Sequence, residues 1–179
     1  MTRWAALLRG VNVGGRKLAM ADLRTMLAGM GFADVETLLA SGNAVFSAAE
    51  NDAARLERAL EAKSAETLRL ATDYLVRDAD QWADVMAANP FPEVAAERPN
   101  QLLVLFHRDP FDPALLDLLA EHYDGPERLK PVGRELYIDF PNGQGRSDLV
   151  PMMTKLKFPK VATGRNWNTV TKITAKLGE

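Results

Sequence analysis

The order of apolar segments along the chain constrains the fold more than any other feature of this sequence. Before the segment FPEVAAERPN, the patterns predict a strand, a helix, two strands, a helix and a strand; after it, the same order returns. A β-α-β-β-α-β order is typical of the split βαβ unit of ferredoxin-like domains. We therefore predict an α+β protein of two ferredoxin-like βαββαβ units packed together, followed by a C-terminal helix. The halves share no residue-by-residue repeat, so the prediction depends on element order.

The elements of the first half follow from apolar runs and their spacing. Residues 3–9, RWAALLR, form a short apolar run before a glycine, which is typical of a buried strand. A helix that ends at Gly31 is predicted by four side chains with i, i+3, i+4, i+7 spacing: Leu23, Met26, Leu27 and Met30. The other predicted elements are a hairpin of residues 34–40 and 43–48, a helix over about 52–68, a strand over 71–77, and a short helix that ends at Asn89-Pro90.

The second half gives the same kinds of pattern. Its predicted elements are a strand over 101–107, a helix that starts at Asp112-Pro113, a hairpin of residues 128–132 and 135–140, a helix over about 148–156, a strand near Val161, and a last helix over about 166–177. The Pro-containing segment between the halves reads as a linker. We therefore divide the chain into a first unit with an extra helix, a linker, and a second unit with the C-terminal helix: residues 1–90, 91–100 and 101–179.

The composition excludes several classes of protein. The 179 residues are 47% hydrophobic and include no cysteine, so the chain forms no disulfide and has no thiolate metal site or nucleophile. The apolar run at the start is too short for a signal peptide, and Arg9 interrupts it. No stretch approaches the roughly 18 uncharged apolar residues of a membrane span. We expect a cytoplasmic protein with no membrane partner; the oligomeric state does not follow from the sequence.

Positive charge is concentrated at the two ends of the chain, although the net charge is only −2. Before Asp22 every charge is basic, and residues 146–179 carry seven basic side chains against Asp148 and Glu179. Two basic ends could converge into one face that binds an anionic partner. The alternative is that these charges only keep the surface solvated.

The loop GVNVGGRK, residues 10–17, follows the first predicted strand and is rich in glycine and positive charge. The two strands of a βαβ unit run parallel, so this loop should lie at the same sheet edge as the turn ASGN, residues 40–43. Guanidinium, amide and free backbone N–H groups together can hold an anion. The candidate ligand-binding residues are Arg9, Gly10, Asn12, Gly14, Gly15, Ser41, Gly42 and Asn43. The alternative is a long turn whose Asn and Gly residues adopt left-handed backbone conformations.

The same loop nearly fits the phosphate-binding pattern G-x-x-x-x-G-K-[ST], because Gly10 and Gly15 are correctly spaced. However, Arg16 replaces the lysine of that pattern, and Lys17 replaces the hydroxyl residue that binds Mg²⁺. The predicted helix also begins too late to cap a phosphate. These departures exclude a nucleotide hydrolase of that class.

The C-terminal segment GRNWN is a second candidate. Asn166 is a plausible N-cap of the last helix, where Arg165 and free N–H groups attract anions. Trp167 could stack on a base or a sugar. The alternative is a capped helix whose tryptophan packs inside the protein.

The segment HRDPFDP could carry acid–base chemistry, with His107, Asp109 and Asp112 at the end of a strand. The simpler interpretation is that Asp112 caps the following helix. The only other histidine is His122, and no acidic pair lies at ligand spacing around either ring, so we expect no metal site and no cofactor. No catalytic residue is predicted.

Four segments, ALLRGVNVGG, MADLRTMLAGMGFADVETLLASGNAVF, ANPFP and GRNWNTVTK, together resemble the bacterial "domain of unknown function" family numbered 1697. The resemblance extends from Trp4 to about Leu177. It implies an α+β protein of two ferredoxin-like parts, and it implies no reaction, cofactor or partner. Its motif positions are the candidates above, Arg165, Asn166 and Trp167 included, together with Thr169.

These observations lead to one main hypothesis and two alternatives. In the main hypothesis, the protein binds an anionic, phosphate-bearing ligand, either nucleic acid or a nucleotide-like metabolite, at convergent Gly/Asn/Arg loops. In the first alternative, it is a small-molecule enzyme with a His/Asp acid–base group. In the second, the polar cluster is purely structural and locks the final helix onto the first half.

Overall fold

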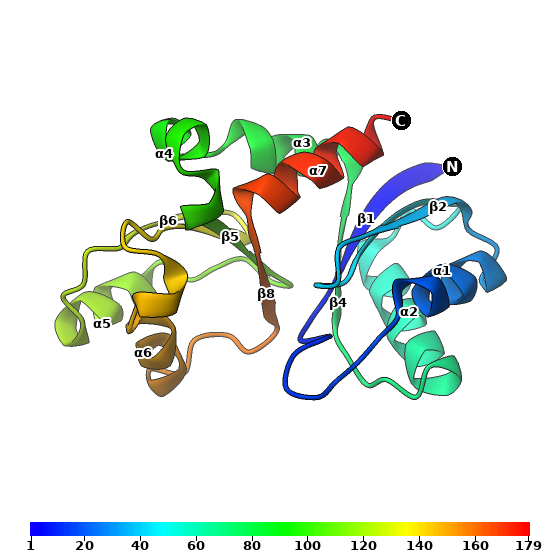
Figure 1. Ribbon diagram of the computed structural model, residues 1–179, viewed down its shortest axis with the longest axis horizontal. Helices are drawn as coiled ribbons and strands as arrows, with labels where there is room; N and C mark the ends of the chain where they lie inside the picture. Colours follow the sequence, from blue (N-terminus) through cyan, green and yellow to red (C-terminus); the bar gives the residue numbers. More distant parts are fainter. The chain divides into compact units, whose positions relative to one another are not determined.

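The computed structural model describes residues 1–179 and contains two four-stranded antiparallel sheets, each with helices between its strands (Figure 1). The chain divides into two units: Met1–Met86 with Thr171–Glu179, and Ala87–Val170. The strand orders are β2-β3-β1-β4 and β6-β7-β5-β8, so both sheets have the ferredoxin-like order. The predicted fold class is therefore confirmed.

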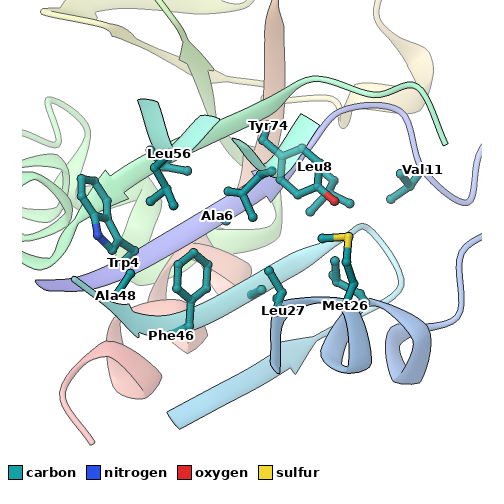
Figure 2. Close-up of a cluster of buried hydrophobic side chains, with 14 residues drawn as sticks. Trp4, Ala6, Leu8, Val11, Met26, Leu27, Phe46, Ala48, Leu56 and Tyr74 are labelled. Atoms are coloured by element: carbon teal, nitrogen blue, oxygen red, sulfur yellow. The ribbon is translucent and has the colours of Figure 1, made fainter. Parts of the chain in front are cut away.

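The first unit places a central strand between two antiparallel neighbours. Its elements are β1 (Thr2–Leu8), α1 (Met20–Gly29), β2 (Ala33–Leu38), β3 (Asn43–Ala48), α2 (Ala53–Thr67), β4 (Tyr74–Asp78) and α3 (Ala79–Ala87). Alternate side chains of β1 point to one face, where α1 and α2 cover the sheet (Figures 1 and 2). Figure 2 shows Ala6 and Leu8 of β1 in this core, with Phe46 of β3, Leu27 of α1 and Leu56 of α2 around them.

The last residues of the chain also belong to the first unit. They form the end of α7 (Trp167–Leu177). The indole N–H of Trp82 donates to Thr174 Oγ1 at 3.0 Å, and the Arg3 guanidinium donates to the Lys176 carbonyl at 3.0 Å. The Lys176 ammonium lies 2.9 Å from the Glu36 carboxylate. The predicted boundaries placed the whole of this helix in the second unit, whereas its contacts after Val170 are those of the first.

The second unit repeats the arrangement. Its elements are α4 (Pro92–Glu97), a 3₁₀ turn (Pro99–Gln101), β5 (Leu102–His107), α5 (Ala114–His122), β6 (Arg128–Val132), β7 (Glu135–Asp139), a 3₁₀ turn (Gln144–Arg146), α6 (Leu149–Lys155) and β8 (Ala162–Asn166). Side chains of β5 and β7 such as Leu103 and Ile138 form its core with Leu119 of α5 and Leu149 of α6.

Residues 91–100, predicted as a linker, are ordered into α4 and the start of a 3₁₀ turn. The two prolines begin these elements, because proline lacks the N–H that a first helical residue leaves unbonded and already has a helical φ. Val94 of α4 is buried, and the whole segment belongs to the second unit. The segment predicted as a linker therefore contains helical structure that begins at its prolines.

A buried carboxylate ties α4 to the second sheet. The side chain of Asp139, at the end of β7, is 3% exposed and accepts hydrogen bonds from two guanidinium groups. Arg98 donates to it at 3.0 and 3.3 Å, and Arg128 of β6 donates at 2.9 and 3.2 Å. Arg128 also lies 2.9 Å from Glu93 and over the ring of Phe91, with its guanidinium carbon 4.7 Å from the ring centroid. Asp139 is therefore the centre of this network.

Replacement of Asp139 by alanine should destabilise the protein by about 2 kcal/mol, because two cations lose their shared buried acceptor. The loss is below the largest known values because both arginines are partly exposed and become hydrated. Glu93→Ala is the matched control: its carboxylate is exposed, so its removal should change stability little. Urea unfolding measures both free energies, and equal losses would show that Asp139 is not the centre of the network.

All three tyrosines resist ionisation in the folded protein. Burial raises the pKa of Tyr74 to about 12 and also raises the pKa of Tyr137. The pKa of Tyr123 is raised by burial and by its hydrogen bond to Glu127. Above pH 10 the unfolded chain loses protons that the folded chain keeps, so the free energy of unfolding should fall as pH rises from about 10 to 12. Native tyrosine absorbance that titrates near pH 10 without unfolding would contradict this.

Candidate functional site

The opening loop ends in an exposed tight turn, from Val13 to Arg16. The Arg16 amide donates to the Val13 carbonyl at 3.1 Å, and the φ values of Gly14 and Gly15 are +57° and +83°, as in a type I′ turn. No atom lies within 4 Å of the position that a Cβ would take at either glycine. The backbone N–H groups of both glycines donate to no acceptor in the protein. The turn therefore presents two adjacent free amides to solvent.

Asn12 closes the base of this turn with its own side chain. Its Oδ1 accepts from the Leu18 amide at 2.9 Å, and its Nδ2 donates to the carbonyls of Leu18, at 3.1 Å, and Ala40. Its φ is +56°, the left-handed conformation that asparagine tolerates better than most residues. Both ends of the Asn12 carboxamide are thus used to shape the loop and to join it to the turn after β2.

The turn after β2 lies at the same sheet edge as the opening loop, as the sequence predicts. The Leu8 amide donates to the Gly42 carbonyl at 2.9 Å. Asn43 is buried, and its Nδ2 donates to the Leu38 carbonyl at 2.8 Å and to Ser41 Oγ at 2.9 Å. The two segments meet because β1 and β2 both run antiparallel to β3, which lies between them.

The segment Ala71-Thr72-Asp73 completes this edge, although it was predicted to be part of a strand. The Arg9 guanidinium lies 3.1 Å from the Asp73 carboxylate, and the Arg9 amide donates to the Asp73 carbonyl at 3.0 Å. Thr72 donates its hydroxyl to the Arg9 carbonyl, and Arg16 donates to the Ala71 carbonyl. The sheet topology could have placed this segment at the edge, because β4 is antiparallel to β1 and must begin where β1 ends.

The basic side chains of the loop therefore differ in how far contacts within the protein already occupy them. Arg9 is partly exposed, and the Asp73 carboxylate neutralises its charge. Arg16 is exposed, and one of its guanidinium N–H groups donates to the Ala71 carbonyl. Lys17 is exposed and pairs with no group of the protein. Of the three cations, Lys17 is the one whose charge no protein contact uses.

Arg165, Asn166 and Trp167 lie where β8 ends and α7 begins. Arg165 is 5% exposed and donates to Thr163 Oγ1 at 2.7 Å and to the Gly164 carbonyl at 2.8 Å. Burial lowers the pKa of its guanidinium to about 10. Asn166 Oδ1 accepts from the Thr169 amide at 3.0 Å, which confirms its N-cap role, and Trp167 is 9% exposed. Ligand binding by these residues remains a prediction, and the contacts described here are internal.

The His/Asp candidates of the second unit separate into a buried ring and exposed carboxylates. The His107 ring is buried, with Nδ1 3.1 Å from the Arg134 carbonyl and the ring centroid 5.3 Å from that of Phe111. Asp112 Oδ1 accepts from the amide of Ala114, the first residue of α5, at 3.0 Å, whereas the N-cap position itself is Pro113. His107 and Asp109 line a cavity of about 210 Å³, which is small for a substrate site.

A larger groove, which the sequence analysis missed, lies against α1 and α2 in the first unit. Its volume is about 640 Å³, and Lys17 and Asp22 are among the residues that line it. Gly29, in the last turn of α1, was the available signal, because a glycine at that position leaves the groove open.

The structure contains no group of three or more His, Asp or Glu side chains placed to hold a metal ion. None of its helices combines the length and the hydropathy that a membrane span requires.

The protein is an α+β protein of two ferredoxin-like units. In the first unit, a polar loop follows the central strand β1. The chain belongs to the family described as "Protein of unknown function (DUF1697)", whose model matches residues 1–137. The expected family is therefore confirmed, and the segment GRNWNTVTK lies beyond the matched residues. The chain is also similar to the conserved bacterial protein SP0830 from Streptococcus pneumoniae, with 25% identity, a TM-score of 0.80, and coverage of 100% of this chain and 99% of that one. Comparison with curated proteins gives no match.

Substitution of Gly42 by alanine should destabilise the protein by about 3 kcal/mol, because overpacking adds to backbone strain. Its Cβ would lie 2.6 Å from Val11 Cγ2 and 3.0 Å from Leu8 Cβ, at a φ of +88°. Gly15→Ala is the matched control, since its φ of +83° is similar but no atom lies within 4 Å of its Cβ position, and it should cost only about 1–2 kcal/mol. Chemical denaturation compares the two, and equal losses would show that close approach at Gly42 is unimportant.

Proposed function

We propose that the protein binds a phosphate-bearing anion at the turn Val13–Arg16 and the neighbouring Lys17. The observation that carries this proposal is the pair of free amides at Gly14 and Gly15, followed directly by two exposed basic side chains. Adjacent backbone N–H groups in a turn make a concave site for an anion, and a nearby cation strengthens it. A phosphate group is the natural ligand for such a site because it offers several acceptor oxygens and a negative charge.

Hydrogen bonds and an ion pair of the surrounding polar residues hold the segments next to this turn in place. Asn12 and Asn43 hold the loop and the adjacent turn in place, and Asp73 restrains Arg9. Arg9 adds little net charge to the site, because the Asp73 carboxylate balances its guanidinium. The cluster thus combines a structural role for the hydrogen-bonded side-chain amides of Asn12 and Asn43 with a binding role for the exposed turn. The proposal does not depend on Arg165 or Trp167.

Short labelled RNA and single-stranded DNA, together with unlabelled nucleotides as competitors, test the proposal by fluorescence anisotropy at about 50 and 200 mM salt. Lys17→Glu should weaken binding at the lower salt by at least about tenfold, since a cation at the phosphate becomes an anion. Lys155→Glu changes the net charge equally on an exposed part of the second unit, and it should change affinity less than about twofold.

The outcomes are distinct. Equal losses in the two variants would mean that only the overall charge of the protein matters, which overturns a site at this turn. No binding of any phosphate-bearing probe at the lower salt would overturn the proposed function itself.

A further inference from the structure

The groove against α1 and α2 begins where the proposed phosphate site ends. Lys17 lines the groove and follows Gly15 by two positions in the chain. The volume of about 640 Å³ lies within the roughly 300–1,000 Å³ typical of small-molecule sites. Inorganic phosphate at the turn would leave this space empty. The geometry therefore has room for a second, larger part of the same ligand.

Part of the groove lining is apolar. Leu18, Met26 and Leu68 supply apolar surface, and the Met26 thioether belongs to a class of side chain that contacts aromatic rings favourably. Gly29 contributes no side chain, and no atom lies within 4 Å of the position that its Cβ would take. A flat aromatic group such as a base is suited to this surface.

The charged groups of the groove suit a ligand with an anionic end and hydrogen-bond donors. Lys63 is already paired with Glu66 at 3.1 Å, but Lys17 and Asp22 make no ion pair and no side-chain hydrogen bond in the protein. The Lys17 ammonium can bind a phosphate oxygen. The Asp22 carboxylate only accepts hydrogen bonds, so it selects N–H or O–H groups, such as those of a base or a ribose.

We infer that the groove holds the nucleoside part of a nucleoside monophosphate, with the phosphate bound at Gly14, Gly15 and Lys17. This inference rests on the proposed function, since it places the phosphate at the same turn. Asp22 accepts from the ribose or the base, and the base covers Met26 and Leu68. The groove volume of about 640 Å³ leaves room for one nucleoside.

Isothermal titration calorimetry with inorganic phosphate, ribose 5-phosphate and GMP tests this inference. GMP should bind at least about tenfold more tightly than either smaller probe. Gly29→Met fills the groove without backbone strain, and it should remove this advantage while leaving the affinity for phosphate unchanged. Ala28→Met is the matched control, because it adds the same side chain to an exposed position of α1 outside the groove lining, and it should change neither affinity.

Amide chemical shifts give a second measurement that does not depend on the variants. Residues lining the groove, such as Thr25 and Thr67, should shift with GMP and not with phosphate, whereas Gly14 and Gly15 should shift with both. Phosphate binding with no gain from GMP would overturn the inference and leave the proposed function standing. Binding of single-stranded RNA without GMP would also overturn it, and absence of all binding would remove the proposed function as well.

Discussion

The hydrogen bond from the Leu8 amide to the Gly42 carbonyl, 2.9 Å long, is the contact on which the polar edge of the first unit depends. It joins the end of the central strand to the turn that precedes β3. The bond forms only because Gly42 has no Cβ, since one would overlap Val11 and Leu8. With this turn in place, the Asn12 side chain donates to the Ala40 carbonyl and joins the opening loop to the turn.

The polar residues at this edge perform two different physical tasks. Buried or fully bonded amides, such as Asn12 and Asn43, satisfy backbone groups that the loop would otherwise leave unpaired. Gly14, Gly15 and Lys17 instead leave donors and charge in solvent. Hydrogen bonds that fix the neighbouring backbone favour ligand binding by exposed donors, because donors that are already ordered lose less entropy when the ligand binds.

Much of the fold was predictable from local pattern, and the errors have identifiable causes. The helix expected over about residues 52–68 is observed as Ala53–Thr67, with Asp52 as its N-cap, because capping and apolar spacing agree there. The sequence predicts a strand over residues 71–77, yet the backbone of residues 71–73 bonds the opening loop instead of extending β4. In residues 91–100 the same prolines could end one element or begin another, and in the structure they begin α4 and a 3₁₀ turn.

The sequence by itself determined the element order, the family, and the meeting of the opening loop with the turn at residues 40–43, because these follow from periodicity and from the direction of strands in a βαβ unit. Only the tertiary structure decided which polar groups are already used. Asp73 and Arg9 are 64 positions apart, and the pairing of Asp139 with Arg98 spans 41. Such contacts leave no local pattern, since a side chain's hydrogen-bond partners depend on which distant segments packing brings beside it. The groove against α1 and α2 was also decided only by the tertiary structure, because its shape depends on how the side chains of separate segments pack.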